Sequence, residues 1–235
     1  QYLSSYHVNH LGVDSIMKLF HVDLIKCILT QVTLGLHVMQ KRCGFTSGDL
    51  KCGNVFIKSE PVDVTYMGIR IEAPFSCKIA DYGKSSAQIQ RADGKVVRCY
   101  NDSTLANIYL ALHPFKNEFY VSRGELYYTP DLSPTQMYTR TRHMGIPYYQ
   151  SFDYYTFLVS FLTIAEVYYT FFSSSELMDI FWYPVFTQSS NVMVRENIYR
   201  HVLNGTGARY PDTIAMLKST PLKCDAMELV IAALQ

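Results

Sequence analysis

The sequence lacks the features that mark several classes of protein. Its six cysteines form no Cys-x-x-Cys pair and no dense framework, so we expect reduced thiols in an intracellular protein. The seven histidines show no zinc-ligand spacing with cysteine. Charged residues make up only 17% of the chain and the net charge is +1, which gives no general attraction to nucleic acid or anionic membrane. We therefore expect no nucleic-acid partner.

Signals for export, repetition and disorder are also missing. The chain has no secretory signal, no internal repeat and no low-complexity tract, and it does not begin with methionine, which predicts a fragment or a processed product. The hydrophobic share of 49% excludes disorder over most of the length. The 235 residues can therefore bury a substantial core, as one domain or as the large lobe of a bigger protein.

The most hydrophobic run, Tyr154 to Phe172, is nearly long enough to cross a membrane. Glu166 lies within it, and a mid-helix acid costs about 3 kcal/mol on membrane insertion. Four hydroxyl residues also form a polar stripe at helical spacing: Thr156, Ser160, Thr163 and Thr170. We therefore expect no membrane span.

Two short polar stretches stand beside apolar strands. In the first, Asp49, Lys51 and Asn54 precede the predicted strand 55–57, and in the second, the predicted strand 77–80 leads to Asp81 in a turn that ends on glycine. Carboxylate and carbonyl oxygens suit magnesium, and a lysine offsets phosphate charge. The two stretches together predict a site for magnesium and polyphosphate.

The spacing Asp-Leu-Lys-x-x-Asn, followed in order by Asp-Tyr-Gly, resembles the catalytic and metal-binding loops of the protein kinase family. The resemblance implies that ATP and Mg²⁺ are the cofactors. It implies that Asp49 positions the attacking hydroxyl and accepts its proton, and that Lys51 neutralises charge on the transferred phosphoryl group. Asn54 and Asp81 would hold magnesium, and Asp81 with Gly83 would contact the nucleotide.

The fold class that follows is α+β and mainly helical, a kinase-like C-terminal lobe with β-hairpin insertions and no N-terminal lobe. Asp153, at the start of the central helix, is expected to bind the backbone of the catalytic loop as structural support. The expected order within residues 1–235 is a helix over 24–42, the catalytic loop 47–57, the metal loop 77–83, an enlarged activation segment 84–149, the central helix 153–172 and a helical subdomain 175–235.

Local patterns predict the smaller elements. Apolar residues at steps of three and four support the helix 24–42, and Gly44 is a plausible end for it. Alternating residues predict three β-hairpins, at 62–71 with a turn at Met67-Gly68, around Asp93-Gly94, and at 119–128. Further helices are expected at 14–19, 105–112, 176–181 after Ser175, 191–203, and from Asp225 to Leu234.

The chain also departs from the family. Ser47-Gly48 stands where the family commonly has His-Arg, so no arginine is available there to bind a phosphorylated activation segment. No Gly-x-Gly-x-x-Gly occurs, and the small lobe of about a hundred residues that should precede the first helix is not seen. This lobe either lies on another segment or partner protein, or has been lost.

Two functions follow from these observations. The first is an ATP-dependent phosphotransferase of the protein kinase type, directed at Ser or Thr hydroxyls, which needs the small lobe. The alternative is a pseudokinase or structural interaction protein that uses the lobe as an assembly scaffold. In its fold style, a trimmed lobe with long insertions is similar to kinases of large DNA viruses. The expected location is intracellular, either cytoplasmic or virion-associated.

Overall fold

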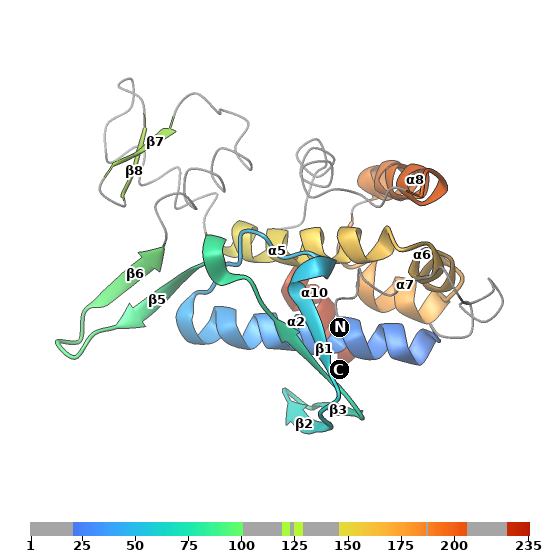
Figure 1. The fold of residues 1–235 in the computed structure, drawn as a ribbon, viewed down its shortest axis with the longest axis horizontal. Helices are drawn as coiled ribbons and strands as arrows, with labels where there is room; N and C mark the ends of the chain where they lie inside the picture. The colour runs from blue at the N-terminus through green and yellow to red at the C-terminus, as the bar shows by residue number, and fades with distance from the viewer. Residues whose placement is uncertain (1–20, 101–118, 123–124, 129–145, 187, 206–224) are drawn as a thin grey trace.

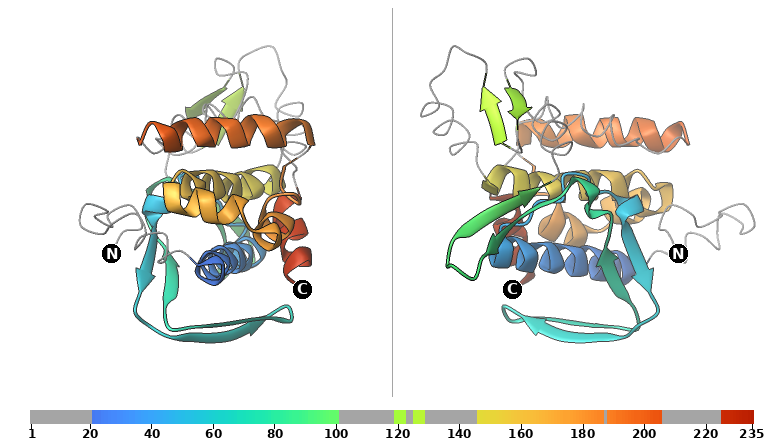
Figure 2. Two further views of the ribbon diagram at one scale, coloured as in Figure 1. Left: turned by 90° about the vertical axis from the view of Figure 1, so that its right-hand side faces the viewer. Right: turned by 60° about the vertical axis from the view of Figure 1, so that its left-hand side comes forward.

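The computed structural model describes residues 21–100, 119–122, 125–128, 146–186, 188–205 and 225–235. These residues form an α+β fold that is mostly helical, with four two-stranded antiparallel sheets among them. The helices are stacked in layers, with α8 (Gln188–Leu203) on one side of α5 (Ile146–Leu162) and α2 (Val22–Cys43) on the other (Figures 1 and 2). The coarse fold class predicted from the sequence is therefore correct.

Helix α2 confirms the predicted helix 24–42 and extends it slightly at both ends. Its core-facing side chains recur every three or four residues, and Ile25, Ile28, Leu29 and Leu36 are fully buried. Gly44 ends the helix in the left-handed conformation, and its N–H donates to the carbonyl of Gln40 at 2.8 Å.

Of the described helices, α2 alone is long and apolar enough to cross a membrane, unless α5 and α6 (Ala165–Phe172) are counted together as one bent span. The core helix of a soluble protein passes the same test, so this is weak evidence. Since the apolar face of α2 packs against other helices of the chain, the structure gives no strong sign of a membrane span.

The prediction of a single central helix over residues 153–172 is wrong. The chain forms two helices there, α5 and α6, whose axes meet at 101°. Ile164 adopts an extended conformation between them, and its N–H reaches only three residues back, to Phe161. Thr163 stabilises the break because its hydroxyl donates to the carbonyl of Ser160 at 2.7 Å. This region is nevertheless buried, because α5 carries a set of fully buried side chains: Tyr154, Tyr155, Phe157, Leu158, Val159, Phe161 and Leu162.

Three further helices complete the described body: α7 (Ser175–Phe181), α8 and α10 (Ala226–Leu234). Ser174, rather than Ser175, caps α7 by accepting from the N–H of Leu177. Asp225 precedes α10 as predicted, although its side chain makes no capping hydrogen bond. The predicted helices 14–19 and 105–112 lie outside the described residues.

All three predicted hairpins are present. Strands β2 (Val62–Tyr66) and β3 (Ile69–Ala73) pair through the turn at Met67-Gly68. Strands β5 (Ser86–Gln90) and β6 (Val96–Tyr100) pair around Asp93-Gly94, and β7 (Phe119–Ser122) pairs with β8 (Glu125–Tyr128). A fourth pair, β1 (Val55–Lys58) with β4 (Ser76–Ile79), brackets the first hairpin and joins the two predicted polar loops.

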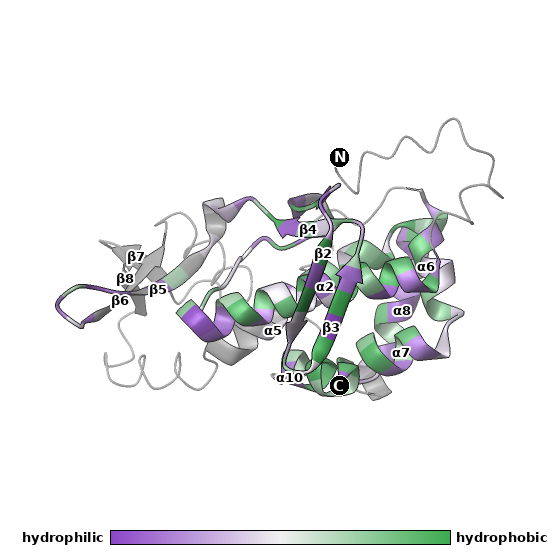
Figure 3. Ribbon diagram, turned by 90° about the horizontal axis from the view of Figure 1, so that it is seen from below, coloured by the Kyte–Doolittle hydropathy of each residue, from purple (hydrophilic) through white to green (hydrophobic). Residues whose placement is uncertain are grey.

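The β2–β3 hairpin packs on α2. Strand β3 alternates buried and exposed residues, visible as green and purple bands in Figure 3, and its buried side chains are Ile69, Ile71 and Ala73. Tyr66 reaches the helix directly, because its hydroxyl lies 3.2 Å from Nδ1 of the buried His37. At the turn, the carbonyl of Met67 accepts a hydrogen bond from the side chain of Gln235 at 2.9 Å.

Candidate functional site

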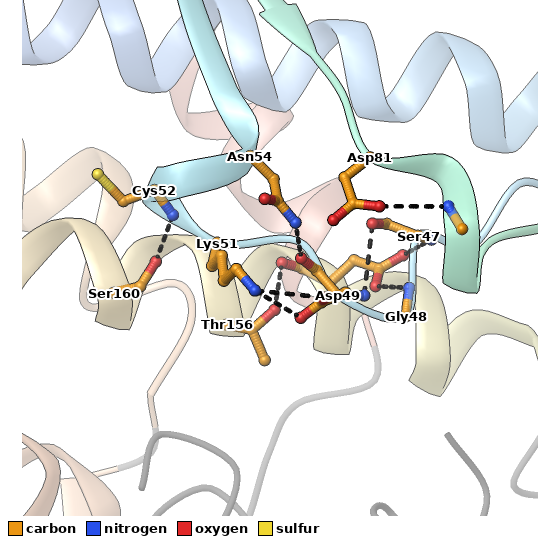
Figure 4. A network of polar contacts seen from close by, with 11 residues as sticks. Ser47, Gly48, Asp49, Lys51, Cys52, Asn54, Asp81, Thr156 and Ser160 are labelled. Atoms are coloured by element: carbon orange, nitrogen blue, oxygen red, sulfur yellow. Dashed lines mark hydrogen bonds and ion pairs between the residues drawn. The ribbon is translucent and has the colours of Figure 1, made fainter. Parts of the chain in front are cut away.

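The loop from Ser47 to Asn54, called here the 47–54 loop, connects α2 to β1 and lies across α5 (Figure 4). Its start is fixed by Asp153 of α5. The carboxylate of Asp153 accepts from the N–H of Ser47 at 2.5 Å and from the N–H of Gly48 at 2.9 Å. Asp153 thus makes the backbone contact that the sequence analysis expected of it.

Asp153 is only 2% exposed, and its environment determines its protonation. Burial raises the pKa of Asp153 to about 7, and the neighbouring Asp49 carboxylate acts in the same direction. The two backbone hydrogen bonds favour the charged form and oppose this rise in the pKa. We therefore expect the protonation of Asp153 to change near neutral pH.

The far end of the loop is a 3₁₀ turn, Cys52–Asn54, and it is also held by α5. Lys51, which precedes the turn, provides no side-chain cap. Instead the N–H of Cys52 donates to the hydroxyl of Ser160 at 2.8 Å. Two polar side chains of one helix therefore bind the two ends of the same loop.

Between these ends lie the three polar residues of the first motif. Asp49 is only 4% exposed, and Nζ of Lys51 lies 3.2 and 3.3 Å from its two carboxylate oxygens. The side-chain nitrogen of Asn54 donates to the backbone carbonyl of Asp49 at 2.8 Å, which leaves the amide oxygen of Asn54 to act as a ligand. The loop therefore presents an acid, a cation and an amide oxygen from one rigid segment.

Asp81 reaches this loop through the β1–β4 pair. The ladder ends at Val55 opposite Ile79, and the N–H of Ala80 donates to the carbonyl of Asn54 at 2.9 Å. Asp81 is the next residue. Figure 4 shows its side chain beside Asn54, over the same stretch of the loop as Asp49. The structure thus brings together the four polar residues that the sequence predicted to converge.

The backbone of Asp81 is unusual, since it adopts the left-handed conformation with φ 58° and ψ 70°. Such a conformation is uncommon outside glycine, and Asp is one of the residue types that adopt it most readily. One carboxylate oxygen accepts from the N–H of Gly83 at 3.4 Å. A Cβ atom at Gly83 would lie 3.3 Å from the same oxygen, so glycine leaves room for the carboxylate.

Tyr82 fixes the turn between these two residues. Its hydroxyl donates to the carbonyl of Ile79 at 2.6 Å, and its ring meets the ring of Phe45 edge to face. Phe45 is buried just before the 47–54 loop. The ring contact therefore provides a second connection between the two loops, in addition to the strand pair.

The donor set fits magnesium only in part. The described residues contain no group of three His, Cys, Asp or Glu side chains that could hold a metal alone. Magnesium commonly takes one or two protein oxygens and completes its octahedron with water and substrate phosphates. Asn54 and Asp81 fit that second arrangement, in which the metal arrives with a phosphorylated ligand.

Sequence reasoning missed the role of Ser160. In the sequence, Ser160 belongs to a hydroxyl stripe whose only evident implication is against a membrane span. The signal was its position seven residues after Asp153, two helical turns along the same face.

Comparison with known proteins leaves the family open, since no protein-family model, no curated protein and no solved structure matches the chain.

Proposed function

We propose that this chain is the large lobe of an ATP-dependent phosphotransferase of the protein kinase type that acts on Ser or Thr hydroxyls. One observation carries the proposal: Asn54 binds the backbone of Asp49 through its side chain and the residue before Asp81 through its carbonyl. Asp49, Lys51 and Asn54 are joined through direct contacts, and Asp81 directly follows the residue that is hydrogen-bonded to Asn54. That is the set a phosphoryl transfer site needs.

Each residue then has a physical role. Asp49 is held by the loop backbone and accepts the proton of the attacking hydroxyl. Lys51 already lies at the carboxylate of Asp49, so it can place positive charge where negative charge develops on the transferred group. Asn54 and Asp81 offer oxygens to magnesium, which when bound would screen the charge of the nucleotide phosphates.

Gly48 bears on regulation. Its φ is 69°, in the left-handed region, and its N–H points to Asp153. Glycine occupies this position without strain, but it offers no side chain to bind a phosphorylated segment. We propose that activation does not use a phosphate clamp at this position. A small lobe with a nucleotide lid, on another segment or on a partner protein, would complete the enzyme.

Nucleotide binding by the full chain tests the proposal directly. Titration with a fluorescent ATP analogue should show magnesium-dependent binding that Asp81→Asn lowers at least about tenfold. Asparagine keeps the acceptor for the Gly83 N–H and removes the charge, so the turn should persist. Asp179→Asn, an isosteric change on the exposed face of α7, is the matched control.

If the wild type binds the nucleotide and Asp81→Asn binds it equally well, Asp81 does not hold the metal. Equal binding with and without magnesium would contradict the proposed donor set. Phosphate transfer to a Ser/Thr peptide pool, measured with the same variants and with Asp49→Asn, then separates an enzyme from a protein that only binds nucleotide.

A second function is favoured by a different part of the molecule. Helices α6, α7 and α8 border a groove of about 320 Å³. Its lining includes Tyr168, Tyr183, Tyr199 and Val192, of which Val192 is 62% exposed. Exposed apolar surface of this kind is typical of protein contacts. We propose the scaffold role as the alternative. It predicts that Val192→Asp abolishes partner capture while Asp81→Asn does not.

A further inference from the structure

The 3₁₀ turn Cys52–Asn54 depends on a hydrogen-bond acceptor from outside the loop. Short 3₁₀ turns have poor internal hydrogen bonds and are used in small pieces. Here the internal bonds run from the N–H of Asn54 to the carbonyl of Lys51 and from the N–H of Val55 to the carbonyl of Cys52. The N–H of Cys52 has its partner in Ser160.

The hydroxyl of Ser160 is oriented for this task. It donates its proton to the carbonyl of Phe157 within α5 at 2.9 Å, which directs its lone pairs away from the helix. One of these accepts from Cys52 at 2.8 Å. The fully buried Phe157 and Phe161 stack at 5.7 Å along the same helix, so the hydroxyl is carried by a rigid element.

We propose that Ser160 is a positioning residue that fixes the amide oxygen of Asn54 for magnesium. This inference rests on the proposed function. Asp153 and Ser160 hold the loop at Gly48 and at Cys52. Asp49 lies between these two points in the chain, and Asn54 lies two residues after the second. Loss of the Ser160 acceptor releases the turn that ends in Asn54, while the end of the loop held by Asp153 keeps its contacts.

The test combines Ser160→Ala with two matched variants. Ser160→Thr keeps a hydroxyl at the same position, so it should restore the contact. Ser173→Ala is the control, because Ser173, the residue after α6, also donates its hydroxyl to a helix carbonyl, that of Tyr169, whereas the N–H of Cys52 donates to Ser160. The readout is the magnesium concentration that gives half-maximal binding of the fluorescent ATP analogue.

The expected result is a rise of about tenfold in that concentration for Ser160→Ala, with restoration by Ser160→Thr and no change for Ser173→Ala. Hydrogen exchange supplies a readout that needs no nucleotide. Exchange over Cys52–Asn54 should speed up in Ser160→Ala, while exchange at Ser47 and Gly48 stays slow.

Three outcomes would overturn the inference. An unchanged magnesium requirement in Ser160→Ala, with normal binding in the wild type, would overturn it alone. Unchanged exchange over the turn would show that Ser160 does not hold it. A wild type that binds no magnesium nucleotide would overturn the proposed function as well, so the two failures are distinguishable.

Discussion

The 47–54 loop and the β2–β3 hairpin are both polar segments next to buried helices, but they use their polar groups in opposite ways. In the loop, Asp49 and Asn54 are buried, and the two ends of the loop are bound by residues about a hundred positions away in the sequence. In the hairpin, Arg70 pairs with Asp63 and Glu72 of the same hairpin, and all three side chains are more than 60% exposed.

The difference decides what each segment contributes. An exposed ion pair gains little, because water solvates the separated charges nearly as well. A buried N–H that loses its acceptor cannot form a hydrogen bond to water instead, so the loss lowers the stability of the folded state by about 1–3 kcal/mol. The hairpin therefore owes its stability to backbone pairing and to the apolar side chains that it lays on α2, whereas the loop owes its geometry to a few buried polar contacts.

The largest effect is expected at Asp153. Asp153→Ala leaves the N–H groups of Ser47 and Gly48 without their acceptor, and we expect a loss of roughly 2–4 kcal/mol in the free energy of unfolding. The relief of removing a desolvated carboxylate is included in that range. Urea denaturation followed by circular dichroism measures the change.

Asp63→Ala is the control in the hairpin, because it removes one acid from an exposed pair. It should cost less than about 1 kcal/mol. Equal losses in the two variants would show that the loop and the hairpin do not differ as described.

The pH dependence of stability sharpens the same contrast. The folded pKa of Asp153, about 7, lies above the ordinary value of 3.8, so between these values the native state holds a proton that the unfolded state has released. Stability through this group therefore falls as pH rises across that window, by roughly 1 kcal/mol per pH unit. Asp153→Asn removes the titration.

Urea denaturation at pH 5 and pH 7 measures this effect as a difference between wild type and Asp153→Asn. The advantage of the wild type should be larger at pH 5. An advantage that grows towards pH 7 would mean that the two backbone hydrogen bonds outweigh burial and that the pKa is depressed.

The same division explains which parts of the structure the sequence could predict. The hairpins followed from alternation and turn residues, and α2 followed from its apolar spacing and from Gly44, because each signal lies within a few residues of the element it specifies. The motif residues Asp49, Asn54 and Asp81 were found by their spacing. Their closeness was expected from the chemistry of a shared magnesium and phosphate site and from the family resemblance, because no local pattern shows the β1–β4 pairing across an intervening hairpin that produces it.

Long-range polar contacts were harder to predict. The acceptor role of Ser160 requires knowing that α5 passes beneath the 3₁₀ turn, which no local pattern states. The break after Leu162 was missed for a related reason. Thr163 continues the hydroxyl stripe and Ile164 continues the apolar run, both at helical spacing, and only the packed structure shows that the chain turns there.

A smaller effect is expected at Gly83, where alanine substitutions of two glycines within the site, Gly83 and Gly53, can be compared. The added methyl group of Gly83→Ala would lie 3.3 Å from a carboxylate oxygen of Asp81, so the carboxylate must shift by a few tenths of an ångström. We expect a loss of several-fold in magnesium-dependent nucleotide affinity, about 1 kcal/mol, with little change in stability. Isothermal titration calorimetry measures the affinity.

Gly53→Ala is the paired control, since a Cβ atom there meets nothing within 4 Å although Gly53 directly precedes Asn54. Its affinity should match that of the wild type. Similar losses for Gly53→Ala and Gly83→Ala would mean that crowding of Asp81 is not the cause.

The smallest effect is expected at Arg70. Arg70→Ala removes both ion pairs of the hairpin but leaves the β2–β3 register and the buried faces of Ile69 and Ile71 intact. The loss of unfolding free energy should be below about 1 kcal/mol and should shrink in high salt, because the pairs are exposed to screening. Thermal unfolding at low and high ionic strength measures it. A large loss that salt does not reduce would place the long Arg70 stem, and not its charge, among the contacts that hold the hairpin on the protein, since such stems can cover apolar surface.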